Sequence, residues 1–133
     1  MMTKKEMIIA AIEANGYKSQ VDEDGDIMVV YYQMKRFYFI VGQDDEQYVS
    51  VVYPQFVEVD EGEDMLALVV CNKVSREAKL AKVYIDQTLK NVTASCEFFY
   101  TDFECLKVCV EYAMNILGMV AHPIFSGASL INY

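Results

Sequence analysis

The sequence predicts an α+β fold, in which an antiparallel sheet made of a strand meander and a later strand pair is flanked by three helices, in the order α-β-β-β-β-α-β-β-α. Two observations predict it. Helical spacing of apolar residues occurs near the start, the middle and the end of the chain, and alternating or β-rich segments lie between. The connections within the meander are short, which is typical of antiparallel strands. The 133 residues fit one domain, expected over residues 1–123, with a tail at 124–133.

The first predicted helix, residues 3–15, has a signal at each end. Thr3 and Glu6 have the spacing of a capping box, in which each side chain bonds the other residue's backbone N–H. Asn15-Gly16 supplies the left-handed residue that commonly closes a helix. The pattern therefore predicts both boundaries of this helix.

Four strands are expected next, at residues 17–21, 26–33, 37–41 and 48–53. Asp24-Gly25 is a hairpin signal between the first two. The aspartates at 22, 24 and 26 suggest a calcium loop, but an EF-hand would need Gly and Glu at positions that hold Ile27 and Gln33, so a plain turn is favoured. Pro54 cannot donate a ladder hydrogen bond, so the last strand ends there, bulges there or lies at an edge.

The middle of the chain, residues 60–78, reads as a helix that starts in the acidic cluster 60–64, where carboxylates suit a helix N-terminus. The run from Met65 to Cys71 is apolar on every side, so one face can pack on the sheet while the other also avoids water. Self-association about a two-fold axis is the simplest way to cover that second face. The expected dimer interface comprises Met65, Leu66, Leu68 and Val69. The alternatives are burial between the other two helices, or a strand at 66–71.

A strand pair and a long helix complete the chain. Residues 79–86 and 91–100 alternate as strands do. Thr101 and Glu104 repeat the capping-box spacing, and apolar stripes continue from there until His122-Pro123, where the helix is expected to stop.

Three features of this order carry a family resemblance: a helix from Ile8 to Gly16 that leads into the Asp24-Gly25-Asp26 hairpin, a helix that closes in Cys71-Asn72-Lys73-Val74, and two strands before a capped long helix. Over about residues 3–121 the chain resembles the YbjN-type family of proposed sensory transduction regulators, which share the fold of the type III secretion chaperones. The resemblance implies a helix-flanked antiparallel sheet, no enzymatic activity, frequent homodimers and, as in the chaperones, partner segments held on apolar surfaces.

Net charge and hydropathy limit the classes of partner and the cellular location that we expect. Eleven basic against twenty acidic residues give a net charge of −9, which disfavours nucleic acid and anionic membranes. No apolar run reaches the length of about 20 residues that a membrane helix needs, and no secretion signal is recognisable, so we expect a cytoplasmic protein. Hydrophobic residues make up 54% of the chain, which suggests that part of them form an interface.

An enzyme or metal-binding protein with a Cys/His site is the alternative function. Its candidate residues are Cys105 or Cys109 with His122, but on one helix His122 would lie about 20 Å from Cys109. The four cysteines lack C-x-x-C spacing, and core packing is favoured over a metal site. We therefore expect no catalytic residues, no metal and no cofactor.

Tyrosine is abundant, with ten residues and no tryptophan. Many of the tyrosines fall on predicted strands, where ordinary sheet packing explains them as well as recognition does. If three or more share the face away from the helices, they would form an amphipathic recognition surface. The residues expected to contact a protein or peptide client are Tyr32, Tyr38 and Tyr53.

Overall fold

The computed structural model describes residues 2–23, 25, 27–31, 35–42 and 46–126 and confirms the predicted α+β order. Its elements are α1 (Lys4–Ala14), β1 (Lys18–Val21), β2 (Ile27–Tyr31), β3 (Lys35–Ile40), β4 (Tyr48–Glu58), α2 (Asp64–Glu77), β5 (Ala81–Ile85), β6 (Asn91–Phe99) and α3 (Phe103–Ser126).

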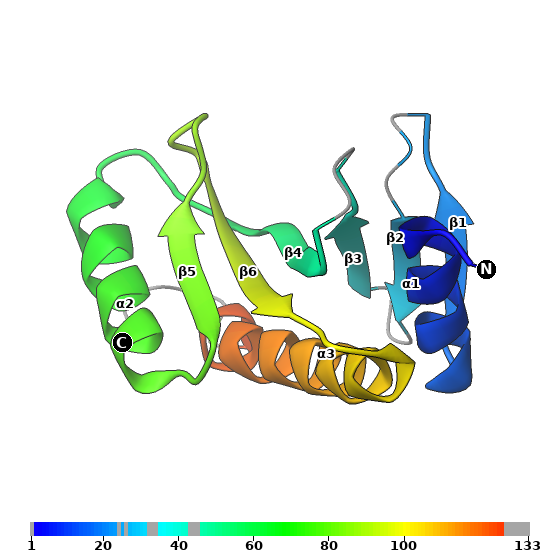
Figure 1. Cartoon of the computed structure of the whole chain (residues 1–133). Coiled ribbons are helices and arrows are strands. Elements are labelled where there is room, and N and C mark those ends of the chain that lie inside the picture. The colour runs from blue at the N-terminus through cyan, green and yellow to red at the C-terminus, as the bar shows by residue number, and fades with distance from the viewer. Residues whose placement is uncertain (1, 24, 26, 32–34, 43–45, 127–133) are drawn as a thin grey trace.

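The six strands form one antiparallel sheet in the order β1-β2-β3-β4-β6-β5. The meander β1 to β4 therefore continues into the hairpin β5–β6, with β6 as the inner strand of that hairpin. Figure 1 shows α3 running across one face of the sheet, α1 beside it near β1 and β2, and α2 at the opposite edge beside β5. We call the face turned away from α1 and α3 the open face.

Local signals set the first helix as predicted. The Thr3 side chain accepts from the Glu6 N–H, and the Glu6 side chain reaches back to the backbone of Thr3. Gly16, with φ of 88°, takes the left-handed conformation that ends the helix. The Asn15 side chain then donates to the Lys107 carbonyl at 3.0 Å, which fixes the end of α1 against α3.

The strand β4 passes through Pro54 as a bulge, one of the three outcomes that the sequence left open. Its register with β6 shifts between Tyr53 and Val57, and Gln55 has a positive φ of 49°. The Gln55 N–H donates to the Thr93 hydroxyl at 3.0 Å in place of a ladder bond. A bulge absorbs the missing proline donor while the strand continues to Glu58.

The core lies between the sheet and the helices. Alternate residues of β2, β3 and β4 point to the helix face and are fully buried, because a strand sends successive side chains to opposite faces. They are Ile27, Val29, Phe37, Phe39, Val49 and Val51. Ile8 and Ile12 of α1 and Leu106, Val110 and Leu117 of α3 close the same core from the helix side.

The middle helix starts later than the sequence suggests. Residues 60–63 form a turn in which the Glu63 N–H donates to the Asp60 carbonyl, with Gly62 at φ 85°. Among the described residues, the cap position Glu63 contributes no side-chain bond to the helix. The expectation that carboxylates of this cluster cap the helix is therefore wrong at this position, because the backbone turn moves the helix start to Asp64.

The last helix differs from expectation at both ends. Asp102, not Thr101, caps it, because the Asp102 carboxylate accepts from the Cys105 N–H at 2.8 Å. At the other end the helix continues through His122 and Pro123 to Ser126. A proline so near the helix end removes only one intrahelical bond, which bends a helix without ending it. Residues 127–133 of the expected tail lie outside the described residues.

Across the described residues, none of the helices combines the length and the apolarity needed to cross a lipid bilayer.

Candidate functional site

The outward face of α2 exposes three large apolar side chains. Met65 is 72% exposed, Leu68 52% and Val69 57%. We call these three residues the α2 patch. Leu66, the fourth residue of the predicted interface, is instead partly buried against the core. The opposite side of the helix, with Ala67, Val70, Cys71 and Val74, is buried. The alternative that the other two helices bury this face is thus wrong, and so is the alternative of a strand at 66–71.

The α2 patch borders a groove of about 550 Å³ between α2 and β5. Leu68 and Cys71 line its helix side, and Tyr84 lies on its strand side. Leu89, which is 70% exposed, closes it from the β5–β6 hairpin. The remaining lining residues are Asp64, Asn72, Val83 and Ile85. The exposed apolar surface of α2 therefore continues across the groove to the hairpin.

Leu89 occupies an unfavourable backbone conformation. Its φ is 63°, in the left-handed region where a residue with a branched, bulky side chain is uncommon. Most of its side chain faces solvent, so core packing does not explain why leucine stands there. A strained apolar residue beside an apolar groove suggests a role in contact. No sequence pattern points to Leu89, because turn chemistry favours Asn or Gly at such a position.

Three tyrosines share the open face. The strand alternation places Tyr38 of β3, Tyr48 of β4 and Tyr84 of β5 there, spread across the sheet. Tyr84 is 38% exposed, and the Tyr48 ring contacts that of Phe99, with ring centroids 5.1 Å apart. Tyr38, one of the predicted client-binding residues, is thus on this face. Tyr32 lies outside the described residues.

Tyr53 does not belong to that surface, and its prediction as a client-binding residue needs correction. It is 7% exposed and points to the helix face, as Val49 and Val51 do. Its ring lies between those of Phe37 and Phe56, with centroids at 4.8 and 4.9 Å. The sequence marks this parity only weakly, because Ser50 is the one polar residue between Tyr48 and Tyr53.

A charged network crosses the open face. Glu97 of β6 pairs with Lys82 of β5 and accepts a hydrogen bond from the Tyr48 hydroxyl. Hydrogen bonds from Lys82 and Tyr48 lower the pKa of Glu97, and the bond to Glu97 is the main cause that raises the pKa of Tyr48 to about 12. The network places charged groups between Tyr48 and Tyr84 on this face.

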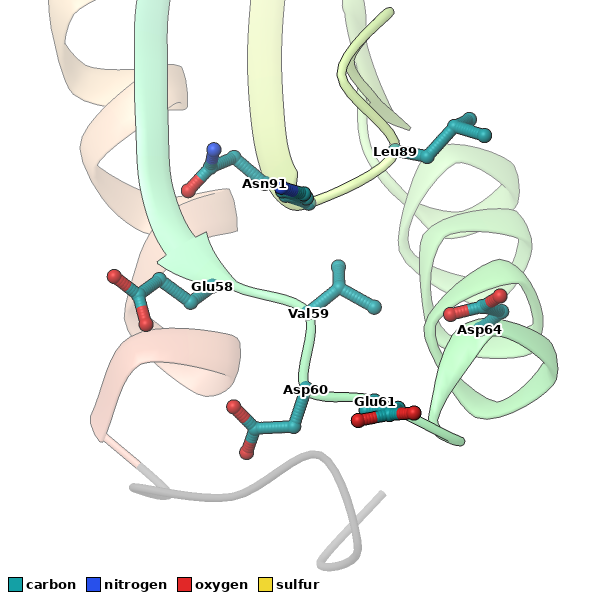
Figure 2. Close-up of a pocket in the computed structure, with 8 residues that line it drawn as sticks. Glu58, Val59, Asp60, Glu61, Asp64, Leu89 and Asn91 are labelled. Atoms are coloured by element: carbon teal, nitrogen blue, oxygen red, sulfur yellow. The ribbon is translucent and has the colours of Figure 1, made fainter.

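An acidic hollow of about 510 Å³ lies where β4 leads into α2. In Figure 2 the Glu58 and Asp60 carboxylates lie on one side of it, Val59 points into it, and Leu89 and Asp64 lie across from them. Lys90 and Asn91 also line it. Surplus negative charge therefore gathers close to the Leu89 end of the groove.

The cysteines fall into two classes. Cys71 and Cys96 are buried, whereas Cys105 and Cys109 of α3 are partly exposed. One continuous helix carries both of the latter and His122, so the expected separation of about 20 Å along the axis holds for Cys109 and His122. In the described parts of the chain, no three His, Cys, Asp or Glu side chains are placed to hold one metal ion.

Solved structures share this fold. YbjN from E. coli, described as a candidate transcription regulator, superimposes with a TM-score of 0.62 and 9% sequence identity, over 84% of this chain and 83% of its own. The chain has the YbjN fold. An uncharacterized protein from Methanothermobacter thermautotrophicus also superimposes on this chain, with a TM-score of 0.57 and 14% sequence identity, over 95% of this chain and 99% of its own. No protein-family model and no curated protein sequence matches the chain.

Proposed function

We propose that this chain is a non-enzymatic protein-binding module of the regulator or chaperone type that works as a homodimer. The α2 patch carries the proposal, because it leaves three large apolar side chains more than half exposed on one helix face. Contiguous apolar surface of this kind marks interaction sites in soluble proteins. The YbjN fold and its resemblance to dimeric chaperones support the same reading by analogy.

A second copy of the chain is the occupant that fits the α2 patch best. A two-fold axis beside α2 would place Met65, Leu68 and Val69 of one copy against the same residues of the other, so one patch would cover itself. Leu89 and the groove continue this apolar surface, which gives Leu68 of the second copy a place to enter. The acidic hollow lies at the margin of this apolar surface, as expected for the polar rim of an interface.

Sedimentation equilibrium tests the dimer. The wild type should sediment at close to twice the chain mass of 15.2 kDa at micromolar concentration. Leu68→Glu should give a folded monomer, because a charge at the patch centre would be buried without a partner. Val108→Glu is the matched control, since Val108 is 49% exposed on α3 and far along the chain from the patch. A monomeric wild type, or a monomer produced by Val108→Glu alone, would contradict an α2 interface.

The open face is the surface that we propose for a protein or peptide client. Tyrosine rings on a sheet with a polar centre combine apolar contact area with hydrogen bonding, as recognition surfaces do. Tyr38→Ser should reduce the partner retained by the immobilised chain. Tyr84→Ser should do the same without changing the sedimentation mass, which is checked because Tyr84 also lines the groove. Tyr112→Ser, which changes a tyrosine 60% exposed on α3, should leave retention unchanged. Equal losses in all three variants would argue against the open face.

A further inference from the structure

Cys105 and Cys109 lie one turn apart on α3 with their Sγ atoms separated by 3.9 Å. Both are partly exposed, in contrast to the buried Cys71 and Cys96. Neither belongs to the α2 patch or to the open face, so the proposed function makes no use of them. Paired thiols that oxidants can reach are uncommon in structural roles, where a cysteine usually serves as a small buried hydrophobe.

The surroundings of the two sulfurs shift their thiol pKa values in opposite directions. Cys105 is in the first turn of α3, where hydrogen bonds from the backbone and then the side chain of Thr101, with a weaker one from Cys109, lower the pKa of its thiol. Burial is the main cause that raises the pKa of Cys109 to about 11, and the bond to Cys105 adds to it. Of the two thiols, Cys105 is therefore the one that loses its proton more readily, and Cys109 is the one that keeps it.

We propose that Cys105 and Cys109 form a modification site for peroxide, in which Cys105 is the nucleophile and Cys109 traps the oxidised product as a disulfide. The geometry supplies a reachable sulfur, three donors around it and a second thiol within contact distance. The site is independent of the dimer and of the client surface.

The two steps balance with hydrogen peroxide as the only oxidant. The Cys105 thiolate attacks one peroxide oxygen, so that an S–O bond forms, the O–O bond breaks and hydroxide leaves. Cys109 then loses its proton and its sulfur attacks the Cys105 sulfenic acid. The S–S bond forms, the S–O bond breaks and the released hydroxide takes up the proton as water. The two thiols supply the two electrons that reduce the peroxide.

Disulfide formation would take place in the first two turns of α3, where Cys105 and Cys109 lie. Residues four apart on a helix have Cα atoms about 6 Å apart, inside the range that disulfides span, but their Cβ atoms, about 5–6 Å apart, must close to about 4 Å. The sulfurs must approach from 3.9 Å to about 2 Å, which requires the first turn to shift. The Cys105 N–H donates to the Asp102 carboxylate and not to a carbonyl of the helix. A shift of the first turn therefore breaks no helical hydrogen bond that the Cys105 N–H donates. Oxidation should therefore loosen the Asp102 cap.

Peroxide titration of the reduced chain tests the site. Intact mass should fall by two hydrogen atoms per chain. Trypsin cuts after Lys107, so the disulfide should join the peptides 91–107 and 108–133. Peptide 91–107 also contains the buried Cys96, so Cys96→Ser shows which cysteine forms the link. The link should persist in this variant. In Cys109→Ser, dimedone should label the sulfenic acid at Cys105.

Cys105→Ser should lose the link and slow thiol oxidation by at least about tenfold. Circular dichroism of Cys105→Ser verifies that the fold is kept, because Cys105 is partly buried against the core. The proposal fails if the link persists in Cys105→Ser, if dimedone labels Cys71 or Cys96 as fast as Cys105, or if oxidation of the wild type gives sulfinic acid or cross-linked chains instead of the internal link.

Discussion

The Ser75 hydroxyl on α2 bonds both backbone groups of Val83 on β5. It accepts from the Val83 N–H at 2.8 Å and donates to the Val83 carbonyl at 3.0 Å. Because β5 is an edge strand, these two groups would otherwise face outward without a ladder partner. One side chain thus attaches α2 to the sheet edge and satisfies that edge at its middle residue. It also orients the helix so that Met65, Leu68 and Val69 point away from the sheet.

Ser75→Ala should lower the free energy of unfolding by about 1–3 kcal/mol, because it leaves two part-buried backbone groups without their partner. Urea unfolding followed by circular dichroism measures the change. Asn72→Ala, an exposed position on the same helix, is the control and should stay within about 0.5 kcal/mol of the wild type. Equal effects of the two substitutions would show that water replaces the Ser75 bonds.

Leu89→Asn should affect monomer stability and dimer affinity in opposite directions. Asparagine tolerates the left-handed conformation better than leucine, so the free energy of unfolding should rise by up to about 1 kcal/mol, measured in the Leu68→Glu background. In the otherwise wild-type chain the dimer dissociation constant should increase, because an apolar wall of the groove is lost.

Leu80→Asn is the matched control for that experiment. Leu80 has a φ of 61° and is 64% exposed, but it does not line the groove. Its replacement should bring the same gain in stability with an unchanged dissociation constant. If Leu80→Asn weakens the dimer as much as Leu89→Asn does, the contribution of Leu89 to the dimer interface is contradicted.

The Glu97 network predicts a pH dependence of stability. The pKa of Glu97 is lowered in the folded chain, first by Lys82 and then by Tyr48. Its contribution to stability is therefore present above the unfolded pKa of about 4.3 and is lost as pH falls through the folded value. Because the group is partly exposed, the contribution should be only about 0.2–1 kcal/mol.

Thermal unfolding of wild type and Glu97→Gln between neutral pH and pH 3 measures that contribution. The stability difference between the two proteins should shrink as the pH approaches 3. Lys82→Met should remove most of the same pH-dependent difference, since Lys82 is the main cause of the shift. A wild-type advantage that grows toward acid pH would contradict the sign of the shift.

The start of α3 offers a direct comparison of two capping schemes. Asp102→Ala should cost about 0.5–2 kcal/mol, because it removes the acceptor of the Cys105 N–H. Glu104→Ala should cost less, since Glu104 has an exposed pair with Lys107 at 3.1 Å. Denaturant unfolding of both variants decides between them. A larger loss for Glu104→Ala would favour the Thr101–Glu104 capping box that the sequence predicts.

Features encoded within a few residues were predictable from the sequence. The Thr3–Glu6 capping box, the end of α1 at Asn15-Gly16 and the order of the nine elements all follow from short-range spacing. The apolar surface of the middle helix was also predictable from the sequence. In a run without polar residues, the side chains that face away from the sheet must be apolar too. Where two local solutions competed, as at Thr101 and Asp102, the pattern alone chose the wrong one.

Tertiary structure decided which side each ambiguous residue faces. Tyr53 is core and Tyr38 is on the open face because the register of β4 with β3 and β6 fixes which way the side chains of these strands point. In the sequence, the single Ser50 is the only polar residue that marks the two sides of β4 between Tyr48 and Tyr53. Cys105 meets Cys109 by helical spacing, but the contrast between the two thiols depends on Thr101 and on burial. The groove exists because Ser75 anchors α2 beside β5 and the β5–β6 hairpin places Leu89 there. These are contacts between segments separated along the chain, so their geometry is set by how the sheet and helices pack rather than by any local pattern.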